Sequence, residues 1–165
     1  MNTWIESAGR IVLIGIGATA VMDIWLLLLQ RLGVPALNFS MIGRWVGHWR
    51  NGQWRHEAIA NAAPVQGELA LGWLVHYATG IGFAFFLVIL HGLAWTHSPT
   101  LSGGLCTGLL TVAAPWLLMQ PAMGAGIASS KTPAPMKNRI RSLVNHAIFG
   151  LGLYLAAVLI AWVSR

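Results

Sequence analysis

The sequence predicts an all-α integral membrane protein with four transmembrane helices. Only 8% of its 165 residues are charged and 56% are hydrophobic, whereas about a quarter of the residues of a soluble domain are charged. No Asp, Glu, Lys or Arg occurs in the 62 residues between Glu68 and Lys131, and about 20 apolar residues suffice for one membrane crossing. The high apolar content excludes a disordered chain, and the single cysteine excludes an internal disulfide framework.

Breaks in the apolar pattern divide the chain into four spans within a single transmembrane domain, residues 1–165. A polar turn at residues 96–100 contains the helix-stopping Pro99 and splits the long uncharged run into two helices. The first span is too long and too evenly apolar for a cleaved signal peptide, so we expect a permanent anchor. The expected transmembrane helices cover about residues 9–32, 69–95, 101–121 and 140–163.

The first loop carries an apolar stripe at helical spacing, which predicts a short interfacial helix lying on the membrane. The stripe consists of Phe39, Ile42, Trp45, Val46 and Trp49. Charged and aromatic side chains of this loop and of its end form the expected membrane-surface set: Arg44, Trp45, Trp49, Arg55, Glu57 and Glu68.

The basic residues predict the orientation in a bacterial inner membrane. Loops one and three contain eight Lys or Arg, and the opposite side contains only Arg10 and Arg165. The positive-inside rule therefore places both loops in the cytoplasm and both termini in the periplasm. The net charge of +6 is then explained by topology and by anionic lipids as partners, without a nucleic acid. A chain of 17.8 kDa is expected to act as a homo-oligomer or within a larger membrane complex.

The second and fourth expected helices share the pattern His-x-x-x-Gly-x-Gly, beginning at His76 and at His146. This match predicts two parallel helix-pair repeats, related by a pseudo-twofold axis along the membrane normal. The glycines four and six residues after each histidine either leave space beside the imidazole ring or permit close helix approach.

Polar residues at similar depth predict an inward-facing cluster in the membrane. An isolated carboxylate at the centre of a bilayer costs about 2.5–3.5 kcal/mol, so Asp23 should be protonated or paired with a histidine. The cluster favours the binding or passage of a small ligand, a metal ion or a proton. The alternative is that its members only fix helix packing. The expected ligand- or ion-binding residues, one from each helix, are Asp23, His76, Gln120 and His146.

Three further classes of function stay open at this point. His76 and His146 are candidate metal ligands and would suit one b-type haem in an electron-transfer subunit. A structural accessory subunit is the second class. A membrane enzyme acting on a lipid headgroup or a polyprenyl substrate is the third, although no Ser-His-Asp order, HExxH motif, zinc spacing or dinucleotide fingerprint supports catalysis. Its candidate residues are Arg44, Arg55, Glu57 and Glu68.

Several short motifs together resemble a family of small bacterial inner-membrane proteins known as a domain of unknown function. The resemblance covers nearly the whole chain and implies four membrane helices and a bacterial source. It transfers no catalytic role, because no activity is attached to the family. The motifs lie at residues 15–23, 43–45, 76–77, 119–126 and 150–154.

Overall fold

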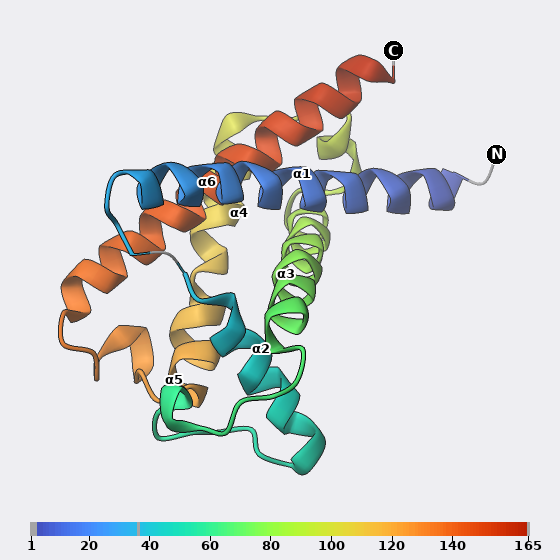
Figure 1. Ribbon diagram of the computed structural model, residues 1–165. Coiled ribbons are helices and arrows are strands. Elements are labelled where there is room, and N and C mark those ends of the chain that lie inside the picture. The colour runs from blue at the N-terminus through green and yellow to red at the C-terminus, as the bar shows by residue number, and fades with distance from the viewer. Residues whose placement is uncertain (1–2, 36, 165) are drawn as a thin grey trace. The chain divides into compact units, whose positions relative to one another are not determined.

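The computed structural model describes residues 3–35 and 37–164, and it contains helices and loops but no strand within these ranges (Figure 1). Arg165, one of the two basic residues expected on the periplasmic side, lies outside the described residues. Short 3-10 helices occur at Trp49–Asn51, Ile59–Asn61, Leu93–Thr96 and Ile127–Ser129. The α-helices are α1 (Thr3–Arg31), α2 (Phe39–His48), α3 (Glu68–His91), α4 (Leu101–Thr111), α5 (Gln120–Ala122) and α6 (Pro135–Val163).

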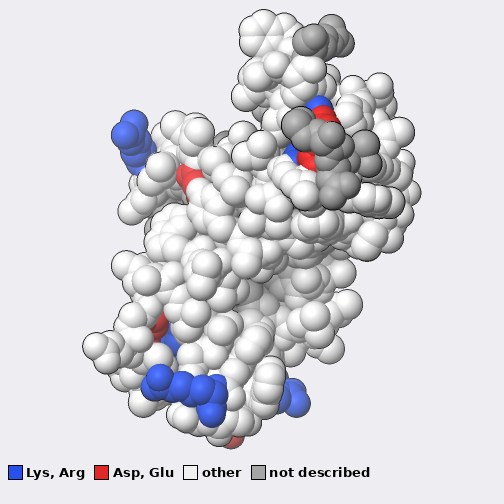
Figure 2. Space-filling model, turned by 90° about the vertical axis from the view of Figure 1, so that its right-hand side faces the viewer, with Lys and Arg blue, Asp and Glu red and all other residues white. Residues whose placement is uncertain are grey.

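Four helical stretches are long and apolar enough to cross a membrane: Trp4–Arg31, Glu68–His91, Leu101–Ala122 and Pro135–Val163. Large apolar side chains on them are exposed, among them Ile24, Ile89 and Leu159, as expected for surfaces that face lipid. Most of the face shown in Figure 2 belongs to residues other than Lys, Arg, Asp and Glu. The prediction of an all-helical, multi-pass membrane protein is confirmed.

Two helix ends differ from the expected positions for identifiable reasons. Helix α3 ends at His91 and not near residue 95, because Gly92 adopts a left-handed φ of 80° and a 3-10 turn follows. Helix α6 begins at Pro135, about one turn before residue 140. Proline suits the first turn of a helix because its missing N–H would have no intrahelical partner there.

The third span is irregular in its second half. Helix α4 ends at Thr111, and a π-helical segment, Pro115–Met119, precedes the single turn of α5. Pro115 has no N–H to donate to the carbonyl of Thr111 four residues earlier, so the regular hydrogen-bond pattern stops there. Segments of π-helix often occur at functional sites, and this one begins four residues after Thr111, which contacts a histidine.

The chain divides into two compact units, which are described separately. Unit 1 comprises residues 1–36, 77–111 and 144–165, and unit 2 comprises residues 37–76 and 112–143. The apolar core of unit 1 includes Ile14, Leu87 and Leu153, whose side chains are fully buried.

Glycines let the helices of unit 1 approach closely. A Cβ added at Gly15 would lie 2.6 Å from the Cα of Ile81, and one added at Gly150 would lie 2.6 Å from the carbonyl oxygen of Gly104. Gly152 similarly faces the backbone of Ala18, where α6 crosses α1 (Figure 1). A Cβ at Gly82, in contrast, would meet nothing within 4 Å. Most glycines of the repeated histidine motif therefore serve helix packing.

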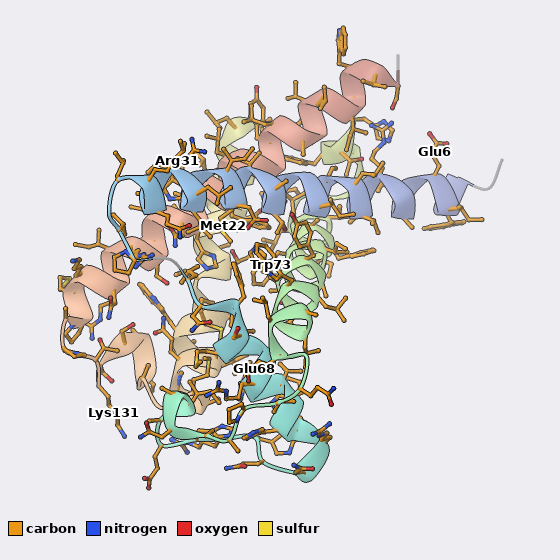
Figure 3. All side chains as sticks on the ribbon, viewed as in Figure 1. Glu6, Met22, Arg31, Glu68, Trp73 and Lys131 are labelled. Carbon is orange, nitrogen blue, oxygen red and sulfur yellow. The ribbon has the colours of Figure 1, made fainter. Side chains whose placement is uncertain are left out.

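In unit 2, α2 packs on the first turns of α3 through a second pair of glycines. A Cβ at Gly43 would collide with the carbonyl oxygen of Glu68, and one at Gly72 would collide with that of Phe39. Glu68 accordingly lies at the start of α3 beside α2 (Figure 3). The side chain of Phe39 is buried against the ring of Trp73, with 4.3 Å between the ring centroids.

Candidate functional site

Asp23 of α1 is bonded to α3 inside unit 1. The hydroxyl group of Tyr77 donates a hydrogen bond to Oδ2 of Asp23 at 2.9 Å. Both residues lie within membrane-spanning helices, where an unsolvated carboxylate is costly. The bond fixes the position of the carboxyl group relative to α3.

A second polar bond links α1 to α6 two residues further along α1. The indole Nε1 of Trp25 donates to Oδ1 of Asn145 at 3.1 Å, and Asn145 is only 6% exposed. A buried amide oxygen requires such a donor. Asn145 directly precedes His146, so this bond also fixes the turn of α6 that carries the histidine.

His146 is bonded to α4, and the geometry defines its neutral tautomer. Oγ1 of Thr111 lies 2.6 Å from the carbonyl oxygen of Gly108, to which it donates, and 2.9 Å from Nδ1 of His146. A hydroxyl group has one hydrogen. Because that hydrogen goes to Gly108, Nδ1 of His146 carries the proton and donates to Thr111. The other nitrogen, Nε2, then carries a lone pair that can accept a proton or bind a ligand.

These three bonds connect the spanning helices of unit 1 in the order α3, α1, α6, α4. We call the six residues that form these bonds the polar layer: Asp23, Trp25, Tyr77, Thr111, Asn145 and His146. Of these residues the sequence analysis selected only Asp23 and His146. The others could have been found by asking which hydrogen-bonding side chains lie within a span, since Tyr77 and Asn145 adjoin the two motif histidines.

The other two members of the expected cluster, His76 and Gln120, belong to unit 2. The ring of His76 lies 4.6 Å from that of Phe39 and 5.8 Å from that of Trp73, measured between centroids. Oε1 of Gln120 accepts a hydrogen bond from the hydroxyl group of Ser129 at 3.1 Å. Within its unit, Gln120 therefore holds the loop that follows the third span.

No group of three or more His, Cys, Asp and Glu side chains that could hold a metal ion occurs among residues 3–35 and 37–164. Within unit 1 His146 contacts Thr111 and Phe83, and within unit 2 His76 contacts Phe39 and Trp73.

Arg44 and Glu68, two of the expected membrane-surface residues, form a bidentate ion pair in unit 2. Nε and Nη2 of Arg44 each donate to one carboxylate oxygen at 2.8 Å, and the side chains are 10% and 17% exposed. Arg44 also donates to the carbonyl oxygen of Ala62 at 3.1 Å, and Glu68 accepts from the N–H of Val65 at 3.0 Å. The hydrogen bond to Glu68 raises the pKa of Arg44. The pair clasps the loop between α2 and α3, and we call it the clasp.

Trp45 and Trp49 contact each other edge to face, with 4.9 Å between ring centroids. Trp54 stacks on Trp49, and its carbonyl oxygen accepts a hydrogen bond from Nε1 of Trp45 at 2.9 Å. The three indoles close the turn that follows α2.

Two buried histidines in the same loop form a hydrogen-bonded pair that the sequence analysis missed. Nε2 of His48 lies 3.0 Å from the carbonyl oxygen of Ala63, to which it donates. In the neutral ring Nδ1 must then accept, and Nε2 of His56 donates to it at 2.8 Å. Nδ1 of His56 is buried and has no partner among the described residues. Burial, followed by the charge of His48, lowers the pKa of His56.

A pocket of about 730 Å³ lies where the first loop meets the third in unit 2. The N–H groups of His56 and Ile59 donate to the carbonyl oxygens of Ala122 and Met123, at 2.8 and 3.1 Å. Gly124 completes this contact, because a Cβ there would collide with the carbonyl oxygen of Glu57 and its φ is +95°. The lining residues are Arg55, His56, Glu57, Pro121, Gly124, Gly126, Ile127, Ser130 and Lys131.

Residues 12–160 match the model of one protein family, described as a protein of unknown function (DUF2938). No curated protein and no solved structure matches the chain. The matched region contains all four spans apart from the ends of the first and the last. It also contains the polar layer, the clasp and the loop pocket. The chain therefore belongs to the DUF2938 family.

Proposed function

We propose that this membrane protein binds or passes a small ligand or a proton through the polar layer of its spanning helices. The observation that carries the proposal is the series of three side-chain hydrogen bonds from α3 through α1 and α6 to α4. Polar and ionisable residues inside a membrane are costly, and they commonly mark ion pathways and proton relays.

Proton exchange is the chemistry that these side chains offer. Asp23 and His146 contribute a carboxyl group and an imidazole, the two side-chain types of the layer that most often act as general acids and bases. Nε2 of His146 carries the free lone pair in the neutral tautomer, and Tyr77 holds the carboxyl group of Asp23. Each can take up a proton and release it without breaking the bond that positions it.

The packing of glycines supports the proposed pair of repeats. Gly80, four residues after His76, lies against Gly15 of α1, and Gly150, four residues after His146, lies against Gly104 of α4. Each helix that carries the histidine motif thus contacts the preceding spanning helix, α1 for α3 and α4 for α6, at the same motif position.

Two contacts between a loop and a helix support the alternating topology on which the proposed orientation depends. Nη1 of Arg10 donates to the carbonyl oxygen of Thr96 at 3.4 Å, which joins the N-terminal part of α1 to the second loop. The N–H of His56 donates to Ala122, which joins the first loop to the end of the third span. The eight-to-two distribution of Lys and Arg favours the inner membrane, with loops one and three in the cytoplasm. A single cysteine introduced at Arg50 in a Cys106→Ser background should react with an impermeant maleimide only after the cells are opened.

Proton flux into proteoliposomes that contain a trapped pH-sensitive dye tests the proposed function. A potassium gradient with valinomycin supplies the driving force. The wild-type chain should conduct protons, and both Asp23→Asn and His146→Ala should abolish the flux. The matched controls are Glu6→Gln, which neutralises an exposed carboxylate of α1, and His97→Ala, which removes an exposed histidine. Equal flux in all five proteins, or flux no greater than that of empty liposomes, would contradict the proposal.

One b-type haem is a second candidate, because the bond from Nδ1 of His146 to Thr111 is the kind that fixes the tautomer of an axial histidine. A visible spectrum of the protein purified from haem-replete cells tests it. A Soret band that is lost in His146→Ala would support haem, and a flat spectrum would exclude it.

A further inference from the structure

The loop pocket of unit 2 is independent of the polar layer, and its chemistry points to a different ligand. We propose that it binds a phosphate group, held between the side chains of Arg55 and Lys131. Arg55 comes from the first loop and Lys131 from the third, and both line the same cavity of about 730 Å³.

The positive charge of the pocket favours an anionic ligand. Arg55 and Lys131 are exposed, and neither forms an ion pair with another of the described residues. The clasp shows the contrast within the same unit, because there Arg44 is saturated by Glu68. Two unpaired cations beside one acidic residue, Glu57, give the pocket a surplus of positive charge. Arginine and lysine are the usual phosphate-binding side chains.

The pocket is also preformed. Ala128 and Ser129 adopt left-handed φ angles of 47° and 60°, which non-glycine residues rarely do. Two bonds hold this strained turn: Arg139 donates to the carbonyl oxygen of Ala128 at 2.8 Å, and Ser129 donates to Gln120 at 3.1 Å. Backbone held in such conformations typically occurs where a ligand is bound.

Gly126 lets the wall of the pocket pack closely against Ser130 and Lys131. A Cβ at Gly126 would collide with the hydroxyl group of Ser130 and would lie 2.8 Å from Cγ of Lys131. The N–H of Lys131 donates to the carbonyl oxygen of Ala125 at 2.9 Å, which fixes the backbone at the start of its side chain. Ser130 lines the same cavity, and a serine hydroxyl group can donate a hydrogen bond.

The position along the chain indicates where the phosphate comes from. Pro121 lines the pocket and lies one residue before the third span ends at Ala122. The end of a span lies at the level of the lipid headgroups. A phospholipid headgroup and a free phosphate ester in water therefore both reach this depth, and they share the chemistry that the pocket recognises. Lys131 extends from the loop that precedes α6 (Figure 3).

Titration calorimetry of the full chain in neutral detergent tests the proposal. The probes are dihexanoyl phosphatidylglycerol, dihexanoylglycerol, which lacks the phosphate, and inorganic phosphate. The phospholipid should bind and the phosphate-free lipid should not. Binding of inorganic phosphate in addition would identify a free phosphate ester as sufficient, and its absence would identify a lipid headgroup. Failure of the phospholipid and of inorganic phosphate to bind, or equal binding of both lipids, would overturn the proposal.

Paired charge-neutralising variants locate the site. The double variant Arg55→Gln/Lys131→Gln should weaken binding about tenfold or more, since each substitution removes a charge-assisted hydrogen bond to the phosphate. Arg50→Gln with Lys137→Gln removes the same charge from exposed residues that do not line the pocket and should leave Kd within about twofold. All four side chains are exposed, so the fold is retained, which the thermal transition verifies. An equal loss in both double variants would mean general electrostatic attraction and would contradict a site.

Discussion

The two units satisfy their polar groups in opposite ways. In unit 1 the polar layer uses single hydrogen bonds between helices, such as Tyr77 to Asp23 and Trp25 to Asn145. In unit 2 the clasp uses four hydrogen bonds around one ion pair, two of which involve backbone groups of the loop. A single bond positions a group and leaves its protonation free to change, whereas a bidentate pair fixes both charges. The difference separates groups suited to exchange from groups suited to hold structure.

Added methyl groups at the glycine contacts should have the largest effect in both units. Gly108→Ala would place a Cβ 2.6 Å from the Cα of Gly150, and Gly72→Ala would collide with the carbonyl oxygen of Phe39. Backbone cannot yield as a flexible side chain does, so each should cost about 1–3 kcal/mol. Thermal unfolding in detergent measures this. Gly82→Ala is the control, because its Cβ meets nothing within 4 Å, and an equal loss there would refute the packing explanation.

Breaking the clasp should have the second-largest effect on thermal stability. Arg44→Ala leaves Glu68 without its cationic partner and frees the carbonyl oxygen of Ala62. We expect a fall in Tm of about 5 °C, and a smaller fall for Arg44→Ala combined with Glu68→Ala, because no unpaired charge remains. Arg50→Ala, an exposed arginine of the same loop, should leave Tm unchanged. If the double variant were less stable than Arg44→Ala and less stable than Glu68→Ala, the result would argue against a mutual pair.

Removing single bonds of the polar layer should change stability less and function more. Hydrogen bonds between membrane helices contribute about 0.6 kcal/mol on average, so Tyr77→Phe and Thr111→Val should unfold within a few degrees of the wild type. The proton flux of Tyr77→Phe should fall, because Asp23 loses the hydrogen bond that positions its carboxyl group. An unchanged flux together with a large loss of stability would reverse the assignment and make the layer structural.

The histidine pair of unit 2 should give the smallest effect, a pH-dependent stability. Burial lowers the pKa of His56 in the folded chain, so the unfolded chain takes up the proton first as the pH falls below about 6.5. Stability is therefore complete above that pH and decreases below it. His56→Asn should remove part of this decrease, and His97→Asn, at an exposed position, should not. A Tm that rises on acidification would contradict the sign.

Much of the fold follows from the sequence, because the membrane leaves few alternatives. The uncharged run from Glu68 to Lys131 and the turn at Pro99 indicate two of the four helices that are long and apolar enough to cross a membrane. The clasp could not be found this way, because Arg44 and Glu68 are separated by a loop whose path depends on the contact of two glycines.

Some of the site residues could likewise be selected from the sequence, whereas others become visible only in the structure. Composition and depth select ionisable groups such as His146, but neutral partners such as Thr111 become visible only when helix rotation is known. The pocket depends on long-range backbone bonds from His56 to Ala122 and from Ile59 to Met123, for which no local sequence signal exists.

Infrared difference titration of the reconstituted protein tests directly whether Asp23 exchanges a proton inside the membrane. Spectra recorded between about pH 4 and 9 should contain a protonated carboxyl band that titrates. The band should be absent in Asp23→Asn, shifted in frequency in Tyr77→Phe and unchanged in Glu6→Gln. A wild-type spectrum with no titrating carboxyl band, or a band that persists in Asp23→Asn, would contradict proton exchange through the polar layer.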